Sequence, residues 1–293
     1  MPNSTKIAFI GLGVMGFPMA GHLQKAGFPV TVYNRTTAKA ELWVETYAGA
    51  WQSTPGLAAR GAAIILICVG NDEDVRSVFY GDDGVLGAVK PGTLVIDHTT
   101  TSAELARELN QAVVAAGGQF LDAPVSGGQA GAINGQLSIM AGGEQEAFTA
   151  AAPIFGTYGK GWQLLGPAGS GQLCKMVNQL CIAGILQGLS EGLALAQKSG
   201  LDVATVQKVL GGGAAQSWQL DNRAQTMAQG DYDFGFAIDW MVKDLGYCLD
   251  EANSKGLDLP VASQVLGFYQ ELQAAGQNRC DTSALLSRLV KPV

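Results

Sequence analysis

A glycine pattern close to the N-terminus constrains the fold more than any other feature of this sequence. Residues 6–10 form a short apolar run typical of a strand, and a helical pattern follows through Met19 and Ala26. In a G-x-G-x-x-G motif the first glycine permits a tight turn, the second lets a pyrophosphate approach, and the third lets helix pack on strand. Residues 30–33 supply a second strand, so the sequence predicts a dinucleotide-binding βαβ unit. The motif consists of Gly11, Leu12, Gly13, Val14, Met15 and Gly16.

The end of the second predicted strand indicates which dinucleotide binds. NAD sites usually place Asp or Glu there to bond the ribose 2′-hydroxyl, but this chain has Asn34, Arg35 and Thr36. An acid would repel a 2′-phosphate, whereas a guanidinium and a hydroxyl can bind it through charge-assisted hydrogen bonds. The sequence therefore predicts NADP (NADPH), with NAD and an ordinary surface charge at Arg35 as the alternative.

Two further apolar runs, residues 64–69 and 93–97, are typical of strands buried on both faces of a parallel sheet. Open α/β sheets bind ligands at the carboxyl ends of their strands, which places Val69 and Thr99 at the predicted binding edge. His98 lies at the same edge. A single histidine without a partner motif is more often structural than catalytic, and structural is the interpretation favoured here.

Residues 120–128 (Phe-Leu-Asp-Ala-Pro-Val-Ser-Gly-Gly) have the pattern of another strand that ends in a turn. Pro124 and the paired glycines would expose backbone N–H groups beside a serine hydroxyl, an arrangement that suits a carboxylate. Ser126, Gly127 and Gly128 are therefore candidate substrate ligands, although the turn alone is ambiguous.

A long, nearly uncharged helical run begins near Gly169 and reaches Ser199. Its polar residues are spaced three or four apart, so they share one helix face; they are Gln172, Lys175, Asn178 and Gln179. The chain alternates strands and helices before this run and is helical after it, so we expect that face to look into the space between two domains. By itself, the stretch fits a solvated polar face equally well.

The helical half contains two further patterns. Gly184, Gly188 and Gly192 stack on one helix face, where each costs up to about 1 kcal/mol relative to alanine. We expect a close crossing with another helix, either within the domain or across a subunit interface. A second helix, predicted from about Phe234 to Ser254, carries an aromatic stripe that is more often core than ligand site.

Composition and charge argue against several classes of binding partner. The net charge is −7 and the pI is near 4.8, with scattered basic residues, so nucleic acid is not expected. Five cysteines without a C-x-x-C motif indicate reduced thiols and a cytoplasmic location. The longest apolar stretch, residues 181–189, is too short to span a bilayer. No motif typical of a metal site is present.

Four motifs in order resemble the β-hydroxyacid dehydrogenase family, which includes 3-hydroxyisobutyrate dehydrogenase, tartronate semialdehyde reductase and the glyoxylate/succinic semialdehyde reductases. They are residues 9–20 around the glycine motif, residues 122–128, residues 169–178 with the pattern G-x-G-x-x-x-K-x-x-N, and residues 243–245, Lys-Asp-Leu. Together they span almost the whole chain. One departure is His22, where the family commonly has Asn; it lies inside the first helix and affects no catalytic position.

The resemblance implies roles for the candidate residues. Lys175 would be the general acid/base, and Asn178 would orient the substrate, a task that Gln179 could share or take over. The substrate carboxylate would be held by Ser126, Gly127 and Gly128. Thr99 would lie near the nicotinamide, Lys243 would contact the cofactor, and Phe236 and Asp244 would belong to the active-site cleft.

We therefore predict an α/β protein with a Rossmann-type NADP-binding domain at residues 1–166, a connecting helix at 167–199, and an all-α substrate and dimerisation domain at 200–293. The predicted reaction interconverts a small β-hydroxy acid and its semialdehyde, without a metal, in a homodimer or homotetramer. Alternatives are a glyoxylate/succinic or tartronate semialdehyde reductase, an imine reductase, for which a lysine is less suited, and a non-catalytic dinucleotide-binding interaction protein.

Overall fold

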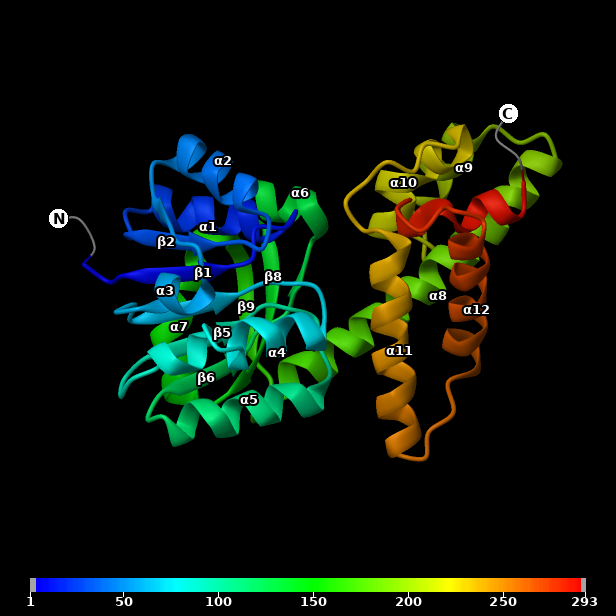
Figure 1. Cartoon of the computed structure of the whole chain (residues 1–293). Coiled ribbons are helices and arrows are strands. Elements are labelled where there is room, and N and C mark those ends of the chain that lie inside the picture. Colours follow the sequence, from blue (N-terminus) through cyan, green and yellow to red (C-terminus); the bar gives the residue numbers. More distant parts are fainter. Residues whose placement is uncertain (1–3, 291–293) are drawn as a thin grey trace. The chain divides into compact units, whose positions relative to one another are not determined.

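The computed structural model describes residues 4–290, which divide into two compact units (Figure 1). Unit 1 extends to Lys175 and unit 2 begins at Met176, so the division falls inside one long helix, α8 (Ser170–Lys198). The predicted α/β class, with a parallel-sheet domain followed by a helical domain, is confirmed.

Unit 1 is built on a sheet whose strand order is β3-β2-β1-β4-β5-β6-β8-β7, with β9 paired to β8. The strands from β3 to β6 run parallel, and β8 joins β6 antiparallel. The order reverses between β1 and β4, which is the point where sheets of this kind bind a dinucleotide. The strands are β1 (Ile7–Ile10), β2 (Val30–Tyr33), β3 (Ala50–Trp51), β4 (Ile64–Ile67), β5 (Leu94–Asp97), β6 (Gln119–Asp122), β7 (Val125–Ser126), β8 (Leu137–Gly143) and β9 (Gly159–Leu164).

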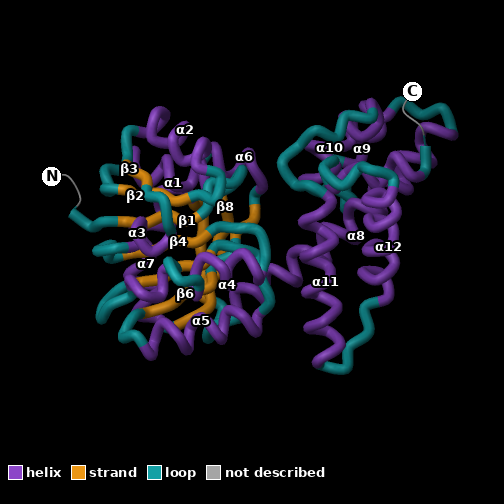
Figure 2. The backbone as a smooth tube through the Cα atoms, in the orientation of Figure 1, coloured by secondary structure: helices purple, strands orange, loops and turns teal. Residues whose placement is uncertain are grey.

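Alternate residues of the parallel strands pack on opposite faces of the sheet, as the two-residue period of a strand requires. In β1, Ile7 and Phe9 belong to one buried cluster, whereas Ala8 and Ile10 belong to another. Helices therefore cover both faces, as Figure 2 shows. On the first face they are α1 (Gly16–Lys25), α2 (Thr37–Tyr47), the short α6 (Gly128–Ile133) and α7 (Gln145–Tyr158). On the second face they are α3 (Pro55–Ala59), α4 (Asp72–Tyr80), the 3-10 helix Val85–Ala88 and α5 (Ala103–Ala115).

Side-chain caps begin the helices at the carboxyl edge of this sheet. The side chain of Asn71 accepts a hydrogen bond from Asp74 N at the start of α4, and that of Ser102 accepts one from Leu105 N at the start of α5. Each cap satisfies a backbone donor that the helix leaves unpaired. The loops that contain Val69 and Thr99 are thus held short between a buried strand and a capped helix.

Unit 2 contains the rest of α8 and four further helices, α9 (Val203–Leu210), α10 (Trp218–Gln229), α11 (Ile238–Ser254) and α12 (Pro260–Ala274), and then the 3-10 helix Thr282–Arg288. Pro260 opens α12, since proline suits the first helical turn. The predicted start of α11 near Phe234 is wrong, because the helix begins at Ile238. Residue Ala237 instead forms an isolated bridge with Asp281, whose carboxylate accepts the N–H of Phe236.

No helix of the described residues packs closely over the glycine stripe of α8. Among the described residues, no atom lies within 4 Å of a Cβ built at Gly184, Gly188 or Gly192. The expectation of a close crossing inside the domain is therefore wrong, and a subunit interface stays a prediction. By length and composition alone, α8 is also the one described helix that could cross a membrane, which is weak evidence because core helices pass the same test.

Candidate active site

The glycine loop after β1 has the geometry that a bound pyrophosphate requires. Gly11 has φ +102°, and a Cβ there would collide with the carbonyl of Cys68 in the neighbouring loop. A Cβ at Gly16 would meet the Gly11 carbonyl, whereas one at Gly13 would meet nothing within 4 Å among the described residues. Gly11 and Gly16 are thus required for packing, and Gly13 leaves space beside the start of α1 for a ligand.

The end of β2 is bonded to this loop. The side chain of Asn34 accepts a hydrogen bond from Leu12 N at 2.9 Å, and Gly11 N donates to Tyr33 O at 2.8 Å. Arg35 and Thr36 are exposed, and Arg35 pairs with Asp74 of α4 at 2.9 Å. Because the Arg35 side chain is 84% exposed, this ion pair contributes at most about 1 kcal/mol and an anionic ligand can displace it.

Thr99 links the loops that follow β4 and β5. Its hydroxyl oxygen accepts a hydrogen bond from Val69 N at 3.1 Å, and its own N–H donates to the carboxylate of Asp97 at 2.9 Å. The structure thus brings together two of the residues predicted at the cofactor edge.

His98 is structural. Its Nδ1 donates to the carbonyl of Ala123 at 2.6 Å, and its Nε2 accepts from the hydroxyl of Tyr158 at 2.8 Å. Burial lowers the pKa of His98 to about 4, so the ring is neutral near pH 7. Both ring nitrogens are engaged in holding β5 to β6 and α7.

Two buried carboxyl groups lie side by side where β5 and β6 end. Asp97 and Asp122 are register partners in the two parallel strands, and both side chains are fully buried. Burial raises the pKa of Asp97 to about 7 and that of Asp122 to about 6. In each case hydrogen bonds from backbone N–H groups oppose the effect of burial.

Asp122 fixes the first turn of α8. Its two carboxylate oxygens accept hydrogen bonds from Gly169 N at 2.7 Å and from Gln172 N at 2.8 Å. A carboxylate at this position satisfies free backbone donors and interacts favourably with the positive end of the helix dipole. The approach is close, since a Cβ at Gly171 would collide with the carbonyl oxygens of Met140 and Asp122.

Gln172 joins the same turn to the loop after β5. Its Nε2 donates to the carbonyl of Thr99 at 2.7 Å, and its Oε1 accepts from Thr101 N at 3.1 Å. Lys175 lies three residues further along α8 and is 8% exposed. Because helical side chains lean toward the N-terminus, Lys175 lies over the turn that Gln172 holds.

The predicted carboxylate cradle is an exposed turn with two left-handed glycines. Gly127 has φ +135° and Gly128 has φ +62°, conformations that other residues rarely adopt. Ser126 precedes them at the end of β7, partly buried, and Ser126 pairs with Ser138 of β8. Both glycines are exposed, so their backbone N–H groups are accessible to a ligand.

In unit 2, the predicted residues form a chain of side chains. The Nδ2 of Asn178 donates to Gln179 Oε1 at 2.7 Å, and the Nε2 of Gln179 donates to Asp244 Oδ2 at 2.6 Å. Lys243 Nζ lies 3.2 Å from the other oxygen of Asp244. Lys243 also lies over the rings of Trp240 and Tyr247, at 5.7 and 5.4 Å from their centroids. Phe236 does not take part in these side-chain contacts and is partly buried against the core of unit 2.

Asp122 and Gln172 were not among the predicted site residues, although both lie inside motifs that the sequence displays. Asp122 is a polar residue at the end of an apolar strand, which is where ligand-binding or capping side chains stand. Gln172 shares a helix face with Lys175. Their partners, 47 to 73 positions away in the sequence, could be found only from the fold.

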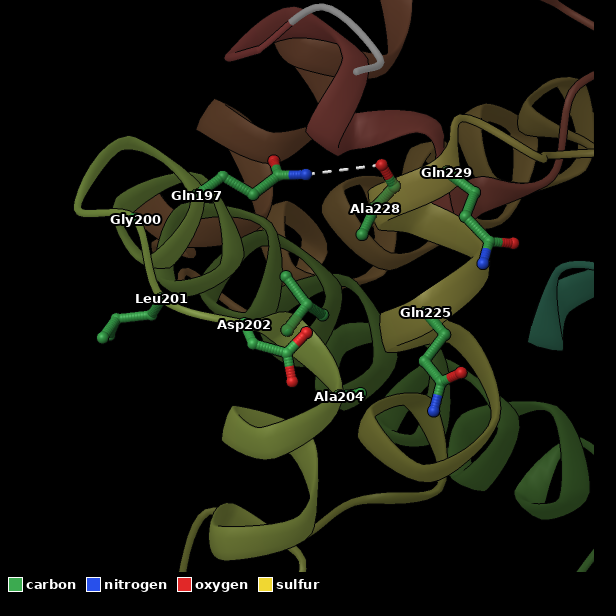
Figure 3. Close-up of a pocket in the computed structure, with 9 residues that line it drawn as sticks. Gln197, Gly200, Leu201, Asp202, Ala204, Gln225, Ala228 and Gln229 are labelled. Atoms are coloured by element: carbon green, nitrogen blue, oxygen red, sulfur yellow. Dashed lines mark hydrogen bonds between the residues drawn. The ribbon is translucent and has the colours of Figure 1, made fainter.

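A shallow pocket in unit 2 is lined by none of these residues. It has a volume of about 470 Å³ and is lined by residues within 197–204 and 225–229 (Figure 3). Asp202 is engaged there in capping α9, and Gln197 Nε2 donates to the carbonyl of Ala228. It holds none of the predicted catalytic or binding residues. Within residues 4–290, no group of three or more His, Cys, Asp or Glu side chains is arranged to hold a metal ion.

Comparison with known proteins decides the family. A sequence profile described as the NAD binding domain of 6-phosphogluconate dehydrogenase matches residues 6–166. A second, described as NAD-binding of NADP-dependent 3-hydroxyisobutyrate dehydrogenase, matches residues 169–289. The chain belongs to the β-hydroxyacid dehydrogenase family. As a member of that family it is an NAD(P)-dependent oxidoreductase, and the resemblance seen in the sequence is confirmed.

Three similar proteins illustrate the likeness. An uncharacterized oxidoreductase of Shewanella frigidimarina is 57% identical and covers 98% of both chains. A probable 3-hydroxyisobutyrate dehydrogenase-like protein of Arabidopsis thaliana is 40% identical over 98% of this chain and 86% of its own. The solved structure of 3-hydroxyisobutyrate dehydrogenase of Mycobacterium tuberculosis with L-serine is 30% identical, with a TM-score of 0.88 over 98% and 99% of the two chains.

Proposed function

We propose that this dehydrogenase catalyses reversible, NADP(H)-dependent hydride transfer between a small β-hydroxy acid and its semialdehyde. The observation that carries the proposal is the placement of Lys175. This lysine lies one turn beyond Gln172, whose side chain bonds the loop of Thr99 at the cofactor edge. A nicotinamide held at this edge would supply the hydride for reduction of the aldehyde carbon, and the ammonium of Lys175 would give a proton to the developing alkoxide oxygen.

In the oxidative direction, the neutral amine of Lys175 takes the hydroxyl proton as the hydride leaves the same carbon. The charge that develops on oxygen is met by a proton or an ammonium at each stage, so the step requires no metal ion. Ser126 and the N–H groups of Gly127 and Gly128 would hold the substrate carboxylate, which would keep the reacting carbon at a fixed distance from its anchor.

Replacement of Lys175 tests this mechanism. Lys175→Met keeps the length of the side chain and removes the proton donor, so kcat should fall by about 10² to 10⁴. Lys198→Ala, at the other end of α8, is the matched control and should retain wild-type turnover. Unchanged turnover in Lys175→Met, measured by NADPH absorbance with a folded protein, would overturn the role of the lysine.

The preference for NADP(H) rests on Asn34, Arg35 and Thr36. Asn34 holds the glycine loop, and Arg35 and Thr36 are exposed beyond it, where a 2′-phosphate would extend from the adenosine ribose. The profile matching the C-terminal part of the chain is described as the NAD-binding part of an NADP-dependent 3-hydroxyisobutyrate dehydrogenase. Arg35→Asp should shift the ratio of kcat/KM toward NADH. Equal efficiency of the wild type with NADPH and NADH would refute the role of Arg35.

The identity of the semialdehyde needs a direct assay. Candidates differ by a methylene or a hydroxyl, which a pocket distinguishes by only about 1–3 kcal/mol when the difference is apolar. Methylmalonate, tartronate and succinic semialdehydes and glyoxylate should be compared with NADPH at equal concentration. The highest kcat/KM with methylmalonate semialdehyde supports a 3-hydroxyisobutyrate dehydrogenase, and a preference for glyoxylate, succinic or tartronate semialdehyde supports the alternative reductase.

We further propose that two copies associate through α8, as a homodimer or within a homotetramer. Exposed apolar side chains lie along this helix beside the glycine stripe, with Val177 60% and Leu195 69% exposed. Small residues would let a second backbone approach closely. Gly188→Leu should lower the mass measured by light scattering, and a wild-type monomer at micromolar concentration would refute the association. A cytoplasmic location, with no membrane or nucleic-acid partner, completes the proposal.

A further inference from the structure

The side chains of Asn178, Gln179 and Asp244 form a hydrogen-bonded relay. Its direction runs from donor to acceptor: Asn178 donates to Gln179, and Gln179 donates to Asp244. Its two bonds are short, at 2.7 and 2.6 Å, and its inner members are closed to solvent, with Gln179 1% and Asp244 4% exposed. The relay joins α8 to α11 within unit 2. At such burial each donor and acceptor needs its partner, since an unpaired one costs about 1–3 kcal/mol.

A carboxylate determines the direction of this relay. Ionised Asp244 can only accept, so Gln179 must turn its NH₂ group toward it and its oxygen toward Asn178. That oxygen can also only accept, so Asn178 must offer its NH₂ group. The carbonyl oxygen of Asn178 is thereby directed away from Gln179. Lys243 Nζ, 3.2 Å from Asp244 Oδ1, forms an ion pair with this carboxylate at the head of the relay.

We propose that Asp244 and Gln179 are positioning residues that make Asn178 present a carbonyl oxygen, and not an NH₂ group, to the reacting groups. Asn178 lies three residues after Lys175 on α8, so both side chains emerge from one helix face. An acceptor there suits the donors of the proposed reaction, namely a substrate hydroxyl or the lysine ammonium. The inference rests on the proposed function, and it assigns to Gln179 and Asp244 an action through Asn178 in place of substrate contact.

The relay can be reversed without leaving any of its bonds unmade. In Asp244→Asn, the amide at position 244 can turn its oxygen to Lys243 and its NH₂ group to Gln179. Gln179 then turns over, and Asn178 must present its NH₂ group. This variant should therefore fold with nearly wild-type stability while kcat falls by roughly tenfold to a hundredfold, the effect of one mispaired buried group.

A second pair of variants blocks and then restores the relay. Gln179→Glu places two carboxylates in direct contact, which should lower both stability and kcat. In the double variant Gln179→Glu with Asp244→Asn, the amide at 244 donates to the carboxylate at 179, which accepts from Asn178. The original direction and the net charge both return, so kcat should recover to within about threefold of wild type, a gap of well under 1 kcal/mol.

The control and the readouts separate this inference from a purely structural role. Asp239 on α11 accepts from Gln273 at 2.7 Å, a carboxylate–glutamine pair outside the relay, and Asp239→Asn should leave kcat unchanged. We would measure kcat, KM and Tm for all four variants with NADPH and the best semialdehyde. A double variant no more active than Asp244→Asn would overturn the relay, as would wild-type kcat in Asp244→Asn.

Loss of the proposed function would show itself differently. If the wild type turns over none of the semialdehydes, the proposed reaction is wrong. The hydrogen bonds of the relay are then tested by measuring the stability of the variants. A favourable coupling between the two substitutions, with the double variant more stable than Gln179→Glu alone, supports the complementary bonds. Additive effects on stability would contradict them.

Discussion

Each unit fixes its part of α8 with a buried aspartate and a glutamine, but the two pairs act on different groups. In unit 1, Asp122 binds backbone N–H groups at Gly169 and Gln172. In unit 2, Asp244 binds the side-chain amide of Gln179. The first arrangement fixes the position of the helix itself, and the second fixes the orientation of a single side chain.

This difference predicts whether a substitution of each aspartate lowers stability, activity or both. Backbone bonds at a helix terminus cannot be remade by rotating a side chain, so their loss must reduce stability as well as activity. Amide groups can rotate and exchange donor for acceptor, so the pair in unit 2 can lose its direction and keep its bonds. The following predictions test that distinction.

The largest effect is expected where the helix approaches the sheet. Gly171→Ala would place a methyl group against the carbonyl oxygens of Met140 and Asp122, neither of which is a flexible side chain. We expect a loss of at least about 3 kcal/mol in the free energy of unfolding, measured by urea denaturation. Gly267→Ala in α12 is the control. A Cβ there meets no described atom within 4 Å, so it should stabilise by up to about 1 kcal/mol.

The close approach of α8 to the sheet is one feature that the sequence could not predict. The glycine motif, the buried strands and the lysine of α8 are local patterns, and from them the fold class and the family could be predicted. The contacts of Asp122 and Gln172 could not, because they join residues about 50 to 70 positions apart and depend on how β6 and α8 pack. The start of α11 was misplaced because Asp281 holds the backbone before it in an extended bridge.

A smaller loss of stability is expected when the charge of Asp122, which holds the first turn of α8, is removed. Asp122→Asn keeps one acceptor and replaces the other with a donor that faces a backbone N–H. The free energy of unfolding should fall by about 1–3 kcal/mol, and kcat should fall with it because Lys175 follows this turn. Asp244→Asn should lower kcat with little change in Tm. Equal losses of Tm in the two variants would remove the distinction between the units.

The pH dependence of stability offers a third test within unit 1. Burial raises the pKa of Asp97 to about 7, against about 3.9 in an unfolded chain. Between these values the folded protein binds more protons than the unfolded chain, so this group's contribution to stability falls as pH rises from about 4 to 7 and is constant above. Asp97→Asn keeps the acceptor for Thr99 N and removes the titration.

Melting temperatures of wild type and Asp97→Asn, measured from pH 4.5 to 8, report this contribution as their difference. The wild type should lose stability relative to the variant as pH rises. Asp202 in unit 2 should give no slope over this range, because its hydrogen bonds with Thr205 lower its pKa, and its contribution is lost only as pH falls below about 4. A constant difference for Asp97 across the range would mean that its carboxyl group does not titrate there.

The smallest effect on stability should come from a carboxylate that is neither buried nor bonded to the backbone. Asp74 pairs with the exposed Arg35, so Asp74→Asn should change the free energy of unfolding by less than about 1 kcal/mol.

The effect of Asp74→Asn on cofactor binding should be larger than its effect on folding, because the substitution frees the Arg35 guanidinium and removes a negative charge near the proposed 2′-phosphate site. We expect NADPH to bind a few-fold more tightly in low salt, with the gain fading as salt screens the charges, while NADH affinity stays constant. Fluorescence titration of both cofactors at two ionic strengths measures this, and an equal gain for NADH would show that Asp74 acts on the loop and not on the phosphate. Unlike Asp122 and Asp244, this aspartate would then influence the ligand without fixing any part of the protein.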